Sequence, residues 1–402
     1  DEEAGSGGSG GAPPKVAGFD GATIKLGVIS PLSGPAAVVG EPLTAGNRLW
    51  LDYVNDELGG IGGKYKVKLV ERDSRADVPT SVQAYNRLKD EVVAFVQLYS
   101  TPAVKALVPA MRKDAAAASP ASLDAAWVRE PNLMPVSAPY QIQAANAMDY
   151  YVRTEGKGGA KKVCTMIEDD AYGDAGQAGV QFAAEQLGFE IAATAKFRLG
   201  DKDYTGQITR LSRARCDVVF LGATVSDVGT ILGTAAAAKF APRWIGQSPT
   251  WLGALAKSPL KPYLEARFWV VAEGPAWGNE SVPGMRDLIA RKKQYPPRKP
   301  IEAGDFYFTF GYIQARTVTT VLERAVAGGD LSKAGILKAI EEVDAVKLDG
   351  LGQDYVYGDV ATRSPGRESS IFAVDADEPF GLKALETNFS SDAAKEYEFS
   401  AG

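Results

Sequence analysis

The sequence predicts an α/β fold built from two doubly wound, Rossmann-like lobes. Strand-like and helix-like patterns alternate from Thr23 onward, and the alternation breaks and then restarts near Val163. Two successive series of βα units are typical of two parallel sheets covered by helices. The length of 402 residues suits two or three domains of roughly 100–200 residues each.

The first series runs from Thr23 to Met111. A strand is expected where apolar residues alternate or run continuously, and a helix where they recur every three or four residues. In chain order these rules predict a strand at 24–28, a helix at 50–58, a strand at 67–69, a helix at 82–88, a strand at 92–98 and a helix at 104–111. The glycine-rich run Leu58–Gly63 ends the first of these helices.

The second series follows the same rules. It contains predicted strands at 163–167, 190–197, 217–221, 243–245 and 268–271, and helices at 174–187, 205–215 and 227–237. We expect the hydroxyl of Thr205 to cap the second of these helices. The last third of the chain returns to helices at 285–291, 306–327 and 331–343, and a strand at 370–374 closes the pattern.

Composition excludes several classes of function. The net charge of −6 argues against a nucleic-acid partner, because such proteins carry basic patches. The chain has no histidine, which removes the commonest general base and metal ligand. The run Gly59–Gly63 is followed by Lys64 and Tyr65, whereas a phosphate loop needs serine or threonine at the second position. We therefore expect a binding protein without cofactor or metal, and not an enzyme.

Two further features leave alternatives open. Cys164 and Cys216 both fall on predicted strands of the second series, so they form either a disulfide in an exported protein or two buried thiols. The polar, glycine-rich start of the chain, within 1–21, predicts a flexible tether. Such a tether suits a lipid-anchored surface protein, and the alternative is a ragged terminus.

The strongest candidate for a binding site is Tyr99-Ser100-Thr101-Pro102. In open α/β sheets, ligands bind beyond the carboxyl ends of the strands, and this segment links a buried strand to the next helix. Free backbone N–H groups, two hydroxyls and the positive end of the helix dipole converge there, which favours a carboxylate or carbonyl group. The alternative is that Ser100 or Thr101 only caps the helix.

Other candidates follow neighbouring strands. Some offer hydroxyls or backbone amides and others an aromatic ring, although packing in the core is the alternative for each tryptophan. They are Ser119, Ala121 and Ser122 in a predicted strand-end turn, Tyr172 after the strand at 163–167, Ser248 and Trp251 after the strand at 243–245, and Trp277 after the strand at 268–271.

Several segments together resemble a known family. They are Ile24–Pro35 (IKLGVISPLSGP), the glycine turn at 59–63, Asp169–Gly173 (DDAYG), Gly200–Thr205 (GDKDYT), Phe306–Arg316 and Arg363–Val374. In this order and spacing they resemble the type I periplasmic solute-binding proteins of ABC importers, the group that includes leucine/isoleucine/valine-binding proteins. The resemblance covers about residues 22–385.

The resemblance implies two lobes joined by a three-segment hinge near residues 142, 275 and 350, with a ligand enclosed between them. It divides the chain into a tether at 1–21, a first lobe at 22–142 and 276–350, a second lobe at 143–275 and 351–385, and a C-terminal tail at 386–402. It also implies a small-molecule solute, a membrane permease as partner, and a periplasmic or lipid-anchored location. We expect a monomer.

The ligand residues that the resemblance implies include Ser100, Thr101, Ser122 and Tyr172. Amino-acid binders of the family place an acidic residue where this chain has Ser248, and cleft tyrosines fall here on Val39 and near Thr224 or Val225. A buried ammonium without an acidic partner is costly. We therefore expect a hydrophobic or aromatic carboxylate, or a neutral amide-like solute. A branched-chain amino acid binder and a ligand-sensing receptor domain are the alternatives.

Overall fold

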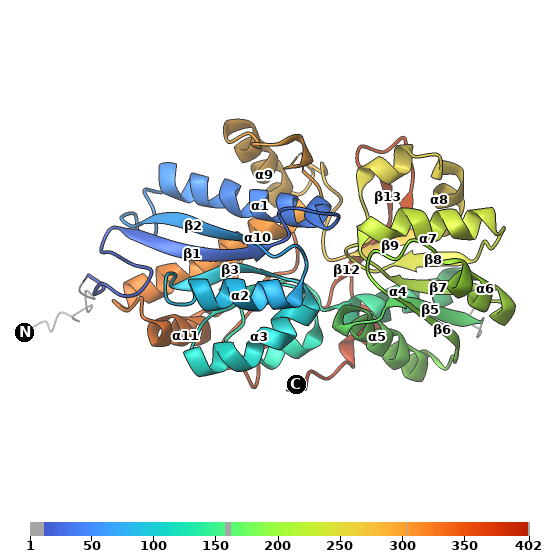
Figure 1. Ribbon diagram of the computed structural model, residues 1–402, viewed down its shortest axis with the longest axis horizontal. Coiled ribbons are helices and arrows are strands. Elements are labelled where there is room, and N and C mark those ends of the chain that lie inside the picture. The colour runs from blue at the N-terminus through green and yellow to red at the C-terminus, as the bar shows by residue number, and fades with distance from the viewer. Residues whose placement is uncertain (1–11, 157–161, 303, 401–402) are drawn as a thin grey trace, which may run out of the picture.

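The computed structural model describes residues 12–156, 162–302 and 304–400. Two lobes lie side by side, each with a central sheet covered by helices (Figure 1). The two-lobed α/β fold predicted from the sequence is therefore confirmed. Residues 1–11 of the predicted tether, where an anchor would be attached, lie outside the described residues.

The first lobe contains a four-stranded parallel sheet in the order β2-β1-β3-β4. Its strands are β1 (Thr23–Ser30), β2 (Lys66–Asp73), β3 (Ala94–Tyr99) and β4 (Ala118–Ala121). All six residues of β3 are buried, as expected of a central parallel strand. Its helices are α1 (Ala37–Asp56), α2 (Val78–Leu88), α3 (Thr101–Asp114), the 3₁₀ helix η1 (Ala125–Arg129), α9 (Pro283–Gln294), α10 (Phe306–Ala327) and α11 (Lys333–Glu342).

The second lobe contains a seven-stranded mixed sheet in the order β13-β12-β9-β8-β7-β5-β6. Its strands are β5 (Val163–Glu168), β6 (Ile191–Phe197), β7 (Val218–Gly222), β8 (Arg243–Gly246), β9 (Phe268–Ala272), β12 (Ser369–Val374) and β13 (Leu382–Phe389). The last two are antiparallel to their neighbours. Its helices are α4 (Tyr140–Thr154), α5 (Ala171–Leu187), α6 (Thr205–Ala214), α7 (Val225–Ala237), α8 (Lys261–Arg267) and α12 (Asp392–Lys395).

Some elements differ from the prediction. The segment expected to be a turn, 119–122, is mostly strand β4, because 118–121 pairs in parallel with β3. Thr205 is the first residue of α6 and does not cap it; the Asp203 carboxylate instead accepts a hydrogen bond from the Thr205 N–H at 2.9 Å. Helix α4 and strand β13 were not predicted, although α10 has the predicted bounds, 306–327.

The first two crossovers between the lobes come close together at Gly352. A Cβ atom on this residue would lie 3.5 Å from the Ser137 hydroxyl and 3.6 Å from the Glu273 carbonyl oxygen, so residues beside both crossovers approach the same glycine. The lobe boundaries stay predictions. Residues 351–357 include β11 (Tyr355–Val356), which pairs with β10 (Ala345–Val346), and they pack in the first lobe. We therefore place the third crossover near 358–368, after the expected hinge at 350. The predicted tail begins within β13.

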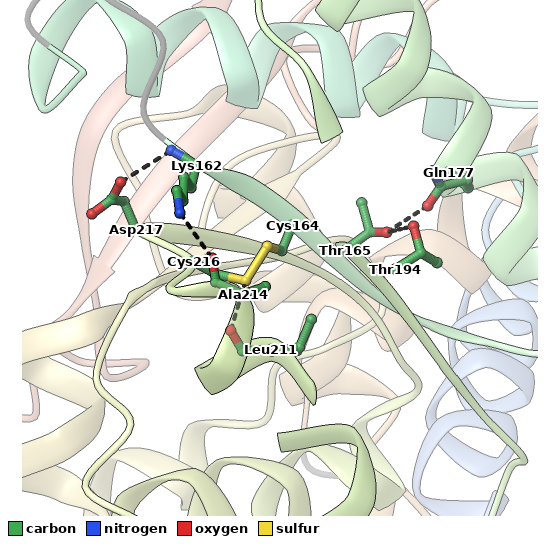
Figure 2. The surroundings of a disulfide bond; sticks show 9 residues. All are labelled: Lys162, Cys164, Thr165, Gln177, Thr194, Leu211, Ala214, Cys216 and Asp217. Carbon is green, nitrogen blue, oxygen red and sulfur yellow. Dashed lines mark hydrogen bonds between the residues drawn. A yellow bond between two sulfur atoms is a disulfide. The ribbon is translucent and has the colours of Figure 1, made fainter. Parts of the chain in front are cut away.

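A disulfide joins Cys164 to Cys216 in the second lobe (Figure 2). Cys164 lies in β5 and Cys216 lies two residues before β7, which pairs with β5. Beside it, the Lys162 N–H donates to the Asp217 carboxylate at 3.0 Å. Of the two alternatives that the sequence left open, the structure has the disulfide.

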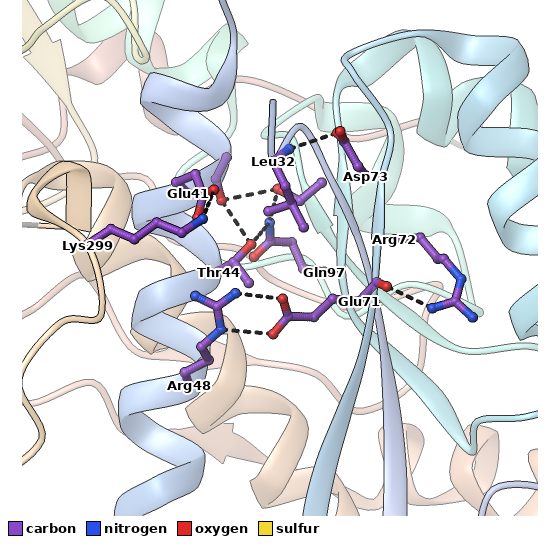
Figure 3. A network of polar contacts seen from close by, with 11 residues as sticks. Leu32, Glu41, Thr44, Arg48, Glu71, Arg72, Asp73, Gln97 and Lys299 are labelled. Carbon is purple, nitrogen blue, oxygen red and sulfur yellow. Dashed lines mark hydrogen bonds and ion pairs between the residues drawn. The ribbon is translucent and has the colours of Figure 1, made fainter. Parts of the chain in front are cut away.

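A polar network fixes α1 of the first lobe against the sheet (Figure 3). Arg48 of α1 donates through Nε and Nη2 to both carboxylate oxygens of Glu71 in β2, at 2.8 and 2.6 Å. Glu41, also in α1, is buried and pairs with Lys299 at 2.5 Å. Bidentate arginine–carboxylate pairs restrict geometry as well as adding energy, so α1 is held in one position.

Candidate ligand-binding cleft

Two adjoining cavities, of about 40 and 70 Å³, lie between the lobes. They share Tyr99, Ala121, Tyr140 and Pro249 as lining residues. The lining includes residues at or just after the carboxyl ends of strands in both lobes, namely β3, β4, β5, β7, β8 and β9. This is the position at which open α/β sheets bind ligands.

The N-terminus of α3 opens toward the larger cavity. Ser100, which caps this helix, has φ 78° and ψ 141°, a conformation that non-glycine residues rarely adopt. Its hydroxyl accepts a hydrogen bond from the Ala103 N–H at 3.3 Å. The hydroxyls of Thr101 and Ser122 lie 2.7 Å apart, and the Trp127 indole N–H donates to Ser122 at 2.9 Å. These bonds hold two hydroxyls beside the positive end of a helix dipole.

Tyr172 lies on the second-lobe side of the larger cavity, in the first turn of α5. The Asp170 carboxylate caps this helix by accepting from the N–H groups of Tyr172 and Gly173 at 2.9 and 3.1 Å. The Tyr172 hydroxyl donates to the Ser248 carbonyl oxygen at 3.1 Å, and the ring packs edge-on against Tyr140. Because the hydroxyl is engaged with the backbone, Tyr172 offers the cavity its ring.

Three acidic residues line the cavities: Glu168, Asp170 and Glu273. The Glu168 carboxylate accepts from the Thr224 N–H at 2.7 Å, and burial raises the pKa of Glu168 to about 8. Burial also raises the pKa of Glu273, and its Oε2 is buried without a hydrogen-bond partner. Among the described residues, no lysine or arginine lines either cavity.

The lining therefore contains carboxyl groups that the sequence-based expectation of a solute without an ammonium group did not consider. That expectation considered one position, Ser248, which follows β8. Glu273 follows the neighbouring strand β9 and lines the same cavity as Ser248. Adjacent parallel strands end at the same edge of a sheet, so an acid after either strand reaches the same region.

Eight of the predicted site residues line these two cavities. They are Tyr99, Ser100, Thr101, Ala121, Ser122, Tyr172, Thr224 and Ser248. Their shared position follows from the rule that was used to select them, because each lies at or just beyond the end of a strand or at the start of the next helix. Whether they contact a ligand stays a prediction.

Ser119, Trp251 and Trp277 do not line either cavity. The Ser119 hydroxyl lies inside β4 and accepts from the Gln314 side chain at 3.2 Å. Trp251 is 1% exposed, and its indole N–H donates to the Phe380 carbonyl oxygen at 3.1 Å, so it belongs to the second-lobe core. Trp277 packs edge-on against Phe308 and lines a separate cavity beside β12 and β13. We therefore remove all three from the candidate site.

Other lining residues were missed. Glu168 and Glu273 end or follow predicted strands, so the strand-end rule could have selected them. Tyr140, Tyr307 and Phe310 lie on helices that are distant in sequence from the strand ends they approach. The sequence carries no local signal that directs these three rings into the cleft.

The two lobes are in contact across the cleft. The Tyr307 hydroxyl, on α10 of the first lobe, lies 2.8 Å from the Trp251 carbonyl oxygen and 3.2 Å from that of Pro249, both in the second lobe. Tyr172 and Ala175 of α5 join the apolar core cluster of the first lobe. The structure therefore has a closed arrangement on this side.

The fold and cleft define a two-lobed binding protein. A profile of the periplasmic binding protein family matches residues 23–379, and the chain belongs to this family. This confirms the family resemblance and agrees with the expectation of a binding protein and not an enzyme. The family places the chain outside the cytoplasm. Among the described residues, no helix has the length and apolar character needed to cross a bilayer.

Curated relatives are similar over part of their length. The chain is 26% identical over 216 residues to Leu/Ile/Val-binding protein homolog 3 of Brucella melitensis, covering 52% of this chain and 57% of that protein. It is 21% identical to the leucine-, isoleucine-, valine-, threonine- and alanine-binding protein of Pseudomonas aeruginosa, covering 56% of this chain and 60% of that protein. The chain thus spans less than two thirds of these relatives.

Solved structures share the fold over nearly the whole chain. A fatty acid ABC transporter substrate-binding protein from Thermomonospora curvata has a TM-score of 0.88 at 24% identity, covering 96% of this chain and 97% of that one. A branched chain amino acid ABC transporter protein from Thermus thermophilus with bound valine has a TM-score of 0.80 at 17% identity, covering 93% and 98%. At these identities the likeness concerns the fold alone.

Proposed function

We propose that this chain is the extracytoplasmic solute-binding component of an ABC importer, which closes two lobes around a small molecule. The observation that carries the proposal is the pair of cavities between the lobes, beside the N-terminus of α3. A ligand that bridges both lobes favours the closed state through its higher affinity for that state. The relatives named for amino acid binding support the same function.

The chemistry of the cleft favours a solute with one acceptor end and an apolar body. Thr101 and Ser122 present a hydroxyl pair beside the N-terminus of α3, which suits a carboxylate or an amide carbonyl. Val39, Leu43 and Phe310 line the smaller cavity and suit a hydrophobic or aromatic body. We therefore propose a small hydrophobic or aromatic carboxylate, or an amide-like solute.

A branched-chain amino acid is the second candidate, and Glu273 is the observation that favours it. The buried Oε2 of this residue has no hydrogen-bond partner in the described protein and could accept from an ammonium group. The Tyr140 and Tyr307 rings line the same cavity. Glu273 thus supports an amino acid as a candidate beside the carboxylate or amide-like solute expected from the sequence.

The two candidates are distinguished by binding measurements. Mass spectrometry of material released from denatured protein would identify a co-purified solute, and calorimetry would then compare carboxylates, amides and amino acids. We expect Glu273→Gln to weaken an amine-bearing ligand at least tenfold and to leave a carboxylate or amide unchanged. Scattering should show a smaller radius of gyration with ligand. Binding without compaction would contradict closure, and no binding by any solute would contradict the proposed function.

The permease partner, the monomeric state and a lipid anchor at the N-terminus belong to the same proposal. An importer component would be encoded beside a permease and an ATPase, whereas a sensor domain would not. Mass determination in solution, with and without solute, tests the monomer. Metabolic labelling with a fatty acid, followed by analysis of the N-terminal peptide, tests the anchor.

A further inference from the structure

Arg363 is buried in the third crossover, at the edge of the first lobe. It is 1% exposed. Its Nη1 donates to the carbonyl oxygens of Glu130 and Leu133 at 3.3 and 3.1 Å, and its guanidinium carbon lies 5.3 Å from the centre of the Tyr357 ring. These contacts fix the position of the guanidinium group and use one of its three nitrogens as a donor.

The other two nitrogens of Arg363 have no acceptor. Both Nε and Nη2 are buried without a hydrogen-bond partner in the described protein. They form one edge of the guanidinium fork, the geometry that takes two oxygens of an anion side by side. The Tyr355 hydroxyl is also buried without a partner, and the Tyr355 ring lies 4.7 Å from the same Tyr357 ring that Arg363 contacts. The groups left unpaired are all able to donate.

The positive charge of Arg363 is not balanced by an ion pair within the described residues. The nearby Glu130 carboxylate pairs with Arg112 at 2.6 Å, and Glu341 acts on Arg363 from beyond ion-pair distance. Arg129 adds a second positive charge, and its Nη1 donates to the Arg363 carbonyl oxygen at 2.5 Å. Burial lowers the pKa of Arg363, but a guanidinium does not lose its proton in a protein.

A buried charge without a partner destabilises the folded chain, and the unpaired donors on Arg363 and Tyr355 add to that destabilisation. An acceptor that carries negative charge removes both penalties at once. A water molecule would satisfy a donor but would leave the charge unbalanced. We propose that Arg363 and Tyr355 bind a small inorganic anion, chloride or a single oxyanion, inside the first lobe and apart from the solute cleft.

The position of this site gives it a structural role in the hinge. Arg363 is held by carbonyl groups of the first lobe, whereas Arg367, four residues later, is held by the second lobe. The Arg367 carbonyl oxygen accepts from Asn146 of α4 at 2.9 Å, and its Nη1 donates to the Ala394 carbonyl oxygen at 2.5 Å. The anion therefore stabilises the first-lobe end of a short crossover.

The direct test is crystallographic. Crystals grown in bromide should show an anomalous peak within hydrogen-bond distance of Arg363 Nε and Nη2, and crystals grown in sulfate or phosphate should show tetrahedral density there if the site takes an oxyanion. Density that fits only water in all of these conditions would overturn the proposal. This readout does not depend on any solute, so it is separate from the test of the proposed function.

Thermal unfolding gives a second test in solution. The melting temperature of the intact chain should rise saturably with chloride relative to gluconate at equal ionic strength. Tyr355→Phe keeps the ring and removes one donor, so its chloride dependence should shift to concentrations about tenfold higher. Arg363→Gln should lose the dependence, and exposed Arg213→Gln is the matched control. If Arg363→Gln does not fold, the chloride dependence of Tyr355→Phe tests the proposal instead. A melting temperature of Tyr355→Phe that responds to chloride as the wild type does would overturn the proposal.

Discussion

The Tyr307 hydroxyl donates to the Trp251 carbonyl oxygen, 2.8 Å away, and this bond joins the first lobe to the second across the cleft. Tyr307 lies in the first turn of α10 of the first lobe, and Trp251 follows β8 of the second. Both groups are buried. Because this bond joins the two lobes, we expect opening of the cleft to break it, so that the bond stabilises the closed state.

Tyr307→Phe should therefore weaken solute binding by destabilising the closed state. A buried hydrogen bond contributes about 1 kcal/mol, which corresponds to about a fivefold increase in the dissociation constant. Calorimetry with an identified solute measures this change. Tyr312→Phe is the matched control, because the Tyr312 hydroxyl bonds Arg291 within the first lobe. Equal affinities for the wild type and Tyr307→Phe would show that the bond does not govern closure.

The raised pKa of Glu168 predicts that the stability of the ligand-free protein depends on pH. Burial raises its pKa from the ordinary 4.5 to about 8 in the folded chain. The unfolded chain therefore releases this proton at lower pH than the folded chain, and stability falls as the pH rises from about 4.5 to 8. Glu168→Gln stays neutral and retains an oxygen for the Thr224 N–H. We expect the variant to gain stability relative to the wild type, on the order of a few kcal/mol, as the pH rises.

Urea unfolding at pH 5, 6.5 and 8 measures this difference. Asp305 also has a raised pKa, about 7, through burial, so the quantity to compare is the free energy of unfolding of the variant minus that of the wild type. Glu185→Gln, at an exposed position in α5, is the control and should show no such trend. A difference that is the same at pH 5 and pH 8 for Glu168→Gln would contradict the assigned burial effect.

The start of the site at Tyr99–Thr101 could be predicted from the sequence because every signal there is local. A continuous apolar run marks β3, two hydroxyl residues follow, and Pro102 suits the first turn of the next helix. The general rule for strand ends then locates the ligand region. The same reasoning selected Tyr172 and Ser248, which also line the two cavities, and their contact with a ligand stays a prediction.

The tryptophans could not be placed in this way. Trp251 lies in a glycine- and proline-containing connection, and such residues predict a turn without fixing the side of the chain on which a ring packs. In the structure its ring packs with Phe268 in the core. Phe310 was not predicted in the site, but it lines the smaller cavity. Helix periodicity predicts that its face of α10 is buried, but it does not show that part of this face reaches the cleft.

The disulfide predicts a large dependence of stability on redox conditions. Cys164 and Cys216 are separated by 52 residues, and closing a loop of that size lowers the entropy of the unfolded chain by an amount worth about 4 kcal/mol. We expect Cys164→Ser combined with Cys216→Ser to lower the free energy of unfolding by about this amount. Urea unfolding with and without a reductant measures it. The reductant should affect the wild type and leave the double variant unchanged; an equal response from both would contradict the prediction.

A substitution at Thr101 tests whether the hydroxyl pair at the N-terminus of α3 contributes to solute binding. Thr101→Val keeps the shape of the side chain but removes the hydroxyl that lies 2.7 Å from Ser122. If this hydroxyl orients the acceptor end of the solute, a lost hydrogen bond to a charged or carbonyl group should raise the dissociation constant roughly tenfold. Thr234→Val, in α7 and away from both cavities, is the matched control. Because Ser122 keeps its bond from Trp127, stability should change little. A variant that binds the solute as tightly as the wild type would exclude Thr101 from the site and leave Ser100 and the backbone of α3 as the groups that hold the ligand.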